Sequence, residues 1–183
     1  AKLAKAQSRI VGLKPYTKEL ETTVRTVAAL SENFTHPYFN KKEVKRAAII
    51  VISADKGLCG SYNSSVVKEA KNFISSNPDI DFKTYFIGKK AKELLVDSVN
   101  FGDFFTFEKA EPTYEEIRKI ASNLSELFIN GEFDAVYVTH NSFLSAISNE
   151  VQTLKVLPLT HEESEDEKLK HQYPYDFKYD IDP

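Results

Sequence analysis

Apolar residues recur through the first 34 positions with the spacing of one long helix. With Leu3 taken as position a of a heptad, eight of the ten a and d sites are apolar. The seam they form contains Leu3, Ala6, Ile10, Leu13, Leu20, Val24 and Val27. Pro15 falls on the outer face in this register, where it would bend the helix without interrupting the seam. Such a helix would be about 50 Å long, so we expect part of it to overhang the domain.

Two interpretations of this apolar stripe stay open. It could lie on the domain as an amphipathic helix, or it could pair with a partner helix in a coiled coil. The 183 residues contain no second heptad stretch, so a partner helix would belong to a missing segment or to another chain. If the seam is exposed, we expect self-association through Ile10, Leu13, Leu20, Val24 and Val27. Replacing Val24 and Val27 by Asp should then abolish the dimer.

After residue 46 the pattern changes to alternating strands and helices. Residues 47–53 form a continuous apolar run, which is typical of a central strand covered on both faces. Further strands are expected at residues 82–87, 101–107, 135–139 and 151–159, the last one reached by a short loop that favours antiparallel pairing. Helices are expected from about Ser64, at Ala91 to Leu95, and after a capping box at Thr113 and Glu116. The predicted class is α/β, a Rossmann-like layered sheet with helices on its faces plus a long N-terminal coiled-coil-type helix.

Three regions follow from these patterns. Residues 1–36 are interpreted as a truncated N-terminal helix of a coiled coil, and residues 37–160 as a Rossmann-like globular domain. Residues 161–183 begin as an acidic loop and continue with the two-residue period of an extended strand. The closing Asp182-Pro183 is typical of a helix start. Because the chain begins within a helical pattern and contains no Met, we interpret it as a fragment.

Charge and cysteine content limit the function classes. The net charge is −3, from 24 basic and 27 acidic residues, with the basic excess in the first 46 positions and the acidic excess after His161. No basic patch is evident in the globular region, so nucleic acid is not a predicted partner. A single cysteine cannot form an internal disulfide, which suits a reducing compartment. No apolar run approaches the roughly 18 residues of a membrane span.

The glycine-bearing loop after the central strand is the main candidate for chemistry. Gly57 and Gly60 are three positions apart without a third glycine in register, so the dinucleotide fingerprint is incomplete, and no Walker loop is present. Cys59 has no neighbouring base and is expected to pack the loop. The histidines at positions 36, 140, 161 and 171 lack metal-site spacing, and His140 is expected to have a structural role. We predict no catalytic, cofactor-binding or metal-binding residues.

One segment resembles a known family closely. Residues 53–63, SADKGLCGSYN, are similar to the S-x-D-[RK]-G-L-C-G-x-x-N segment of the gamma subunits of F-type ATP synthases. Residues 1–7 and 13–16 in the first helix match that family as well, as do residues 134–141 and 157–159. The resemblance covers essentially the whole chain, and its central motif is far more selective than a glycine pattern.

The resemblance implies a non-catalytic rotor subunit that couples proton-driven rotation to ATP synthesis or hydrolysis. The missing partner helix would follow Pro183, and the two helices would form an antiparallel shaft inside the ring of catalytic alpha and beta subunits. The globular part would rest on the membrane rotor ring and bind the epsilon-type subunit, on the cytoplasmic side of a bacterial inner membrane. No cofactor is implied. A loop facing the catalytic ring would contain the partner-contact residues Asp55, Lys56, Gly57, Leu58, Cys59 and Gly60.

A second function stays as the alternative. The chain could be a stand-alone Rossmann-like module that binds a nucleotide or another small ligand and dimerises through its helix. The continuation past Pro183 distinguishes the two, because a long second heptad helix is expected of a rotor and a stop codon of a module.

Overall fold

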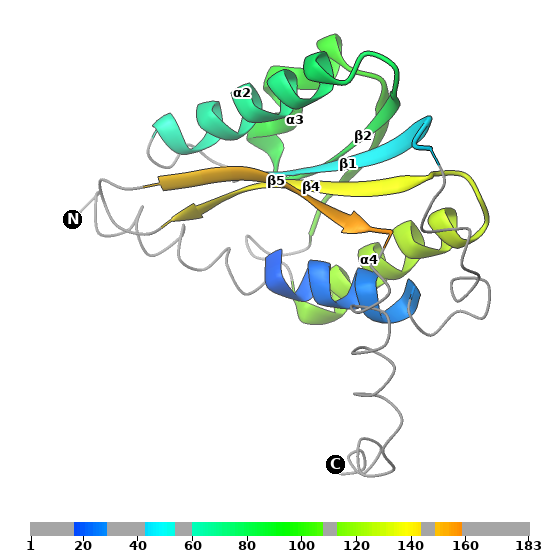
Figure 1. Ribbon diagram of the computed structural model, residues 1–183. Coiled ribbons are helices and arrows are strands. Elements are labelled where there is room, and N and C mark those ends of the chain that lie inside the picture. The colour runs from blue at the N-terminus through cyan, green and yellow to red at the C-terminus, as the bar shows by residue number, and fades with distance from the viewer. Residues whose placement is uncertain (1–16, 29–42, 54–59, 108–112, 144–148, 159–183) are drawn as a thin grey trace.

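The computed structural model describes residues 17–28, 43–53, 60–107, 113–143 and 149–158. Within these ranges one five-stranded sheet is flanked by helices on both faces (Figure 1). The strands are β1 (Arg46–Ile52), β2 (Asp81–Ile87), β3 (Phe101–Phe105), β4 (Ala135–Phe143) and β5 (Asn149–Leu157). The helices are one at residues 17–28, α2 (Gly60–Ser76), α3 (Lys89–Leu95), the short 3-10 helix η3 (Val96–Ser98) and α4 (Tyr114–Ile129). The α/β prediction is therefore confirmed.

The sheet has the order β3-β2-β1-β4-β5, so β1 lies at its centre. β1 pairs in parallel with both β2 and β4, and β2 pairs in parallel with β3. β5 closes the other edge and runs antiparallel to β4, as its short connection predicts. Six consecutive residues of β1 are buried. A strand paired on both sides and covered on both faces needs an unbroken apolar sequence, which explains the run at residues 47–52.

Two apolar layers enclose the sheet, and alternate residues of each strand enter one or the other. Ala47, Ile49 and Val51 of β1 face α2 and α3, where they meet the α2 stripe of Val66, Val67 and Ala70. Ala48, Ile50 and Ile52 face the opposite layer. That second layer contains α4 and the helix at residues 17–28, which lie side by side beneath the sheet in the view of Figure 1.

The helix at residues 17–28 is part of the globular core. Leu20, Val24 and Ala28 have no exposed surface and belong to the same apolar cluster as the buried face of α4. The buried hydroxyl of Ser125 on α4 donates a hydrogen bond to the carbonyl oxygen of Val24, 3.1 Å away. The expectation that Leu20 and Val24 belong to an exposed seam was wrong, because their side chains complete the domain's own core. For these residues the amphipathic-helix interpretation is correct.

The other residues of the expected seam are either partly buried or outside the described residues. Val27 is only partly buried, while Leu3, Ala6, Ile10 and Leu13 lie outside the described residues. The full extent of the N-terminal helix and the acidic region after residue 160 lie outside them too. The continuous coiled-coil seam therefore stays a prediction.

Local helix signals were largely correct. Thr113 and Glu116 form the predicted capping box, with the Thr113 hydroxyl accepting from the Glu116 backbone N–H at 3.1 Å. α2 begins at Gly60, four residues before the position expected from its apolar pattern. Asn63 lies in the first turn of α2 with its side chain buried. The side chain of Leu94 on α3 is 53% exposed.

Candidate functional site

The carboxyl ends of the parallel strands are where α/β proteins usually place their binding residues, and the predicted partner-contact loop begins there. Asp55, Lys56, Gly57, Leu58 and Cys59 lie outside the described residues. Gly60 is the first residue of α2. The structure therefore does not place this loop, but it defines the fixed points on either side of it.

Hydrogen bonds join the carboxyl ends of β1 and β2 at Ser53, shortly before the loop begins. The Ser53 backbone N–H donates to the carbonyl oxygen of Ile87 at 2.8 Å, and the Ser53 hydroxyl accepts from the Ala91 N–H at 2.9 Å. Gly88 makes this approach possible with a φ of 99°, a conformation that favours glycine. A Cβ atom at position 88 would overlap the Ser53 carbonyl group. Ser53, Gly88 and Ala91 thus form a strand-end clasp. The clasp fixes the position of Ser53, from which the chain continues into the loop.

A second polar link connects the antiparallel edge of the sheet with α2. The hydroxyls of Thr139 on β4 and Thr153 on β5 are 2.7 Å apart, and Thr153 donates to Glu69 of α2 at 2.8 Å. Thr139 is fully buried, so its hydroxyl needs such a partner. This chain of hydrogen bonds holds β4, β5 and α2 in one arrangement.

His140 and Asn141 follow Thr139 on β4 and are both at least nine-tenths buried. Among the residues that the structure describes, His140 Nε2 and both polar atoms of the Asn141 carboxamide have no hydrogen-bond partner. Burial lowers the pKa of His140 below its ordinary value of 6.5, and the carboxylates of Glu21 and Glu150 oppose this shift without overcoming it. The neutral imidazole is therefore the form that the fold favours.

This shift predicts a pH dependence of stability. Because the folded pKa of His140 lies below 6.5, the unfolded chain takes up the proton first as the pH falls. The contribution of His140 to stability is complete above pH 6.5 and is lost as the pH drops through the folded pKa. Urea denaturation at pH 7.5 and pH 5.5 should show a larger loss of stability for the wild type than for His140→Gln. Equal losses would contradict a neutral buried imidazole.

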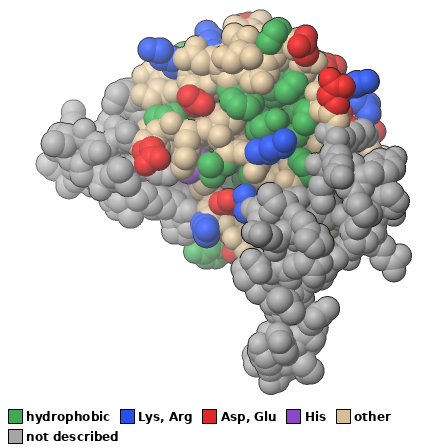
Figure 2. Space-filling view, viewed as in Figure 1, with side chains coloured by type: hydrophobic (Ala, Val, Ile, Leu, Met, Phe, Trp, Pro, Cys, Tyr) green, Lys and Arg blue, Asp and Glu red, His purple; other side chains and the backbone are tan. Residues whose placement is uncertain are grey.

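The hydrogen bonds of this region join the strands of the sheet to α2 and α3. Within the described ranges, no group of three or more His, Cys, Asp and Glu side chains is placed to hold a metal ion. Figure 2 shows acidic and basic side chains interspersed around apolar areas on one face of the molecule. Among the helices that the structure describes, none has the length and apolar character needed to cross a membrane.

Sequence reasoning missed the residues that join the ends of β1 and β2. Ser53 and Gly88 are 35 positions apart, and no local pattern links them. Thr139 and Asn141 carried a weak signal, since polar residues at inward-facing positions of an apolar strand need partners. Thr139 is the last residue of the strand expected at residues 135–139, and Asn141 follows that strand.

Comparisons with known proteins agree with one another. A family model described as ATP synthase matches residues 1–182. The chain is 30% identical over 167 residues to the ATP synthase gamma chain of Desulfitobacterium hafniense, covering 87% of this chain and 57% of that protein. It is 33% identical over 166 residues to the ATP synthase gamma chain of Flavobacterium johnsoniae, covering 90% and 58% respectively. The chain thus spans less than two thirds of the length of these curated relatives.

A solved structure with a similar fold is the central stalk and c-ring of the Tetrahymena thermophila mitochondrial ATP synthase. One of its chains matches with a TM-score of 0.52 and 24% sequence identity. The match covers 86% of this chain and 67% of that chain. At this level of identity the comparison shows a shared fold.

Proposed function

Since this chain belongs to the ATP synthase gamma-chain family, we propose that it works as the non-catalytic central-stalk rotor subunit of an F-type ATP synthase. Its role is to couple proton-driven rotation to ATP synthesis or hydrolysis in the catalytic ring. The observation that carries this proposal is the family match over residues 1–182, which includes both the N-terminal helix and the α/β domain. The subunit itself makes and breaks no bonds.

The packing of the helix at residues 17–28 supports a mechanical role. A rotor must transmit torque between its shaft and its globular part, so the joint between them has to be stiff. Here the joint contains fully buried apolar side chains, the Ser125 to Val24 hydrogen bond, and an ion pair between Glu19 and Arg118 at 3.2 Å. Close-packed interiors have low compressibility. A load on the helix would therefore reach the sheet with little internal deformation.

The partners follow from the same proposal. The long N-terminal helix, paired with a C-terminal helix beyond residue 183, would form the shaft inside the ring of alpha and beta subunits. The domain at residues 37–160 would bind the epsilon-type subunit and rest on the membrane rotor ring, on the cytoplasmic side of a bacterial inner membrane. The loop from Asp55 to Gly60 would face the catalytic ring, where the strand-end clasp of Ser53 and Gly88 would hold its base in place.

A calorimetric titration with the epsilon-type subunit tests the proposal. We expect saturable one-to-one binding of that protein, and no heat beyond dilution with ADP or NAD. The two nucleotides are the matched controls because a stand-alone Rossmann-like module would bind one of them. Nucleotide binding without any response to the epsilon-type subunit would overturn the rotor proposal in favour of the module.

A further inference from the structure

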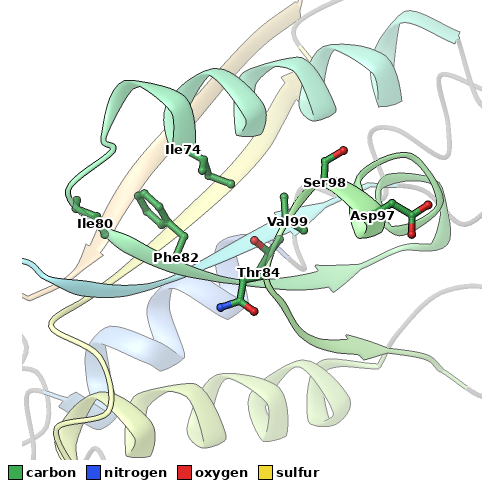
Figure 3. Close-up of a pocket in the computed structure, with 8 residues that line it drawn as sticks. Ile74, Ile80, Phe82, Thr84, Asp97, Ser98 and Val99 are labelled. Carbon is green, nitrogen blue, oxygen red and sulfur yellow. The ribbon is translucent and has the colours of Figure 1, made fainter.

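A hollow lies between the end of α2 and the turn that leads from η3 into β3 (Figure 3). Its volume is about 410 Å³, within the range of small-molecule sites. Its lining residues are Ile74, Ile80, Phe82, Thr84, Asp97, Ser98, Val99 and Asn100. It lies on the α2 face of the sheet and shares no lining residue with the strand-end clasp or the helix joint described above.

Thr84 is the unusual residue of this lining. Its side chain has no exposed surface, and within the described part of the chain its hydroxyl oxygen has no hydrogen-bond partner. Figure 3 shows the side chain beside Val99, on the side of the sheet that α2 covers. Thr139, equally buried on β4, has a hydroxyl partner at 2.7 Å. A buried hydroxyl without a partner is costly. A hydrogen-bonding group that reaches Thr84 from the hollow would therefore remove a cost that Thr139 does not carry.

The backbone beside Thr84 is irregular at the same point. The pairing of β2 with β3 shifts register between Thr84 and Tyr85, and Gly102 is the extra residue on β3. The Thr84 N–H donates to the Asn100 carbonyl oxygen at 2.8 Å, just ahead of this bulge. Bulges bend the strand that contains them and are frequent beside binding sites. The bulge therefore begins directly after Asn100, the last of the residues that line the hollow.

The remaining lining residues indicate what would fit. The apolar walls come from Ile74, Ile80, Phe82 and Val99, whereas oxygen acceptors come from Asp97, Ser98 and Asn100. None of the described residues that line the hollow is basic. We propose that the hollow is a binding site for a small primary amine carried on an apolar ring or branched chain. The apolar body would lie against the walls, and the ammonium group would donate a hydrogen bond to the Thr84 hydroxyl. Asp97, an exposed residue at the edge of the hollow, would contribute a favourable negative charge.

Benzylamine is the probe for this site, with benzoate as its control of opposite charge. Titration of the methyl-labelled protein by NMR should give saturable shifts at Ile74, Ile80 and Val99. The methyl groups of Ile117 on the opposite face of the sheet should not move. Benzoate should give no shifts, because Asp97 repels it. Shifts absent at the three lining methyl groups, or equal for both compounds, would overturn the proposal.

Two variants test the roles of the polar groups. Thr84→Val keeps the shape of the side chain and should weaken benzylamine binding about fivefold, as expected for one lost hydrogen bond. Its denaturation midpoint should not fall, because the hydroxyl has no protein partner, whereas the midpoint of Thr139→Val should fall. Asp97→Asn should weaken binding about threefold, as expected for an exposed charge pair. Unchanged affinity in Thr84→Val would exclude Thr84 from the site and contradict the proposal.

Discussion

Val24→Asp is expected to destabilise the domain by about 4 kcal/mol, a large part of the stability of a typical domain. Val24 has no exposed surface and contributes to the apolar cluster that joins the helix at residues 17–28 to α4. The substitution removes its apolar contacts and places a carboxylate among the buried apolar side chains of that cluster. Urea denaturation followed by circular dichroism measures the effect.

Val27→Asp is the matched control for Val24→Asp. It introduces the same charge one turn further along the same helix, at a side chain that is only partly buried. We expect a loss within about 1 kcal/mol, as for a substitution away from the core. Comparable losses for the two variants would contradict the orientation of the helix. The comparison replaces the dimer test drawn from the heptad pattern, because Asp at position 24 would act on the fold before it acted on any association.

Gly88→Ala should have the second large effect, a loss of about 3 kcal/mol or more. The φ of 99° at Gly88 is unfavourable for any residue with a Cβ atom, and that atom would overlap the Ser53 carbonyl group. Backbone atoms cannot move aside as the end of a flexible side chain can. The alanine variant should therefore separate the ends of β1 and β2 and break the hydrogen bond from Ala91 to Ser53.

Gly131→Ala separates the cost of backbone strain from the cost of overlap. Gly131 follows α4 with a φ of 85°, but a Cβ atom there would have no neighbour within 4 Å. We expect it to cost only about 1 kcal/mol. Thermal denaturation of both variants measures the difference. If Gly131→Ala lowered the stability as much as Gly88→Ala, backbone strain alone would account for both losses. Overlap with the Ser53 carbonyl group would then contribute nothing.

Elements with a strong local pattern could be predicted from the sequence. The unbroken apolar run at residues 47–52 has few interpretations besides a central strand, and the capping box at Thr113 contains its own partner three residues later. In both cases the physical cause lies within a few positions. The start of α2 was misplaced because its first turn, from Gly60 to Asn63, carries no apolar stripe.

Features that join distant segments could not be predicted. The heptad pattern showed that Leu20 and Val24 must be covered, but periodicity does not say whether the cover is another chain or the domain itself. Asp134 is a further example. One of its carboxylate oxygens accepts from the backbone N–H groups of Lys45 and Arg46 at 3.0 and 3.1 Å, which braces the start of β1 from a position 88 residues away. The orphaned hydroxyl of Thr84 likewise becomes visible only in three dimensions.

The joint between the helix at residues 17–28 and α4 also bears on the order in which the chain folds during synthesis. Its polar contacts, Glu19 with Arg118 and Val24 with Ser125, join residues 99 and 101 positions apart. The helix leaves the ribosome early, but the surface that covers Leu20 and Val24 does not exist until α4 has followed. Domains dominated by such distant contacts fold slowly and expose apolar surface in the meantime. The helix at residues 17–28 is therefore expected to become protected from hydrogen exchange only after α4 has formed, and a nascent chain stalled before residue 114 should need a chaperone that covers Leu20 and Val24.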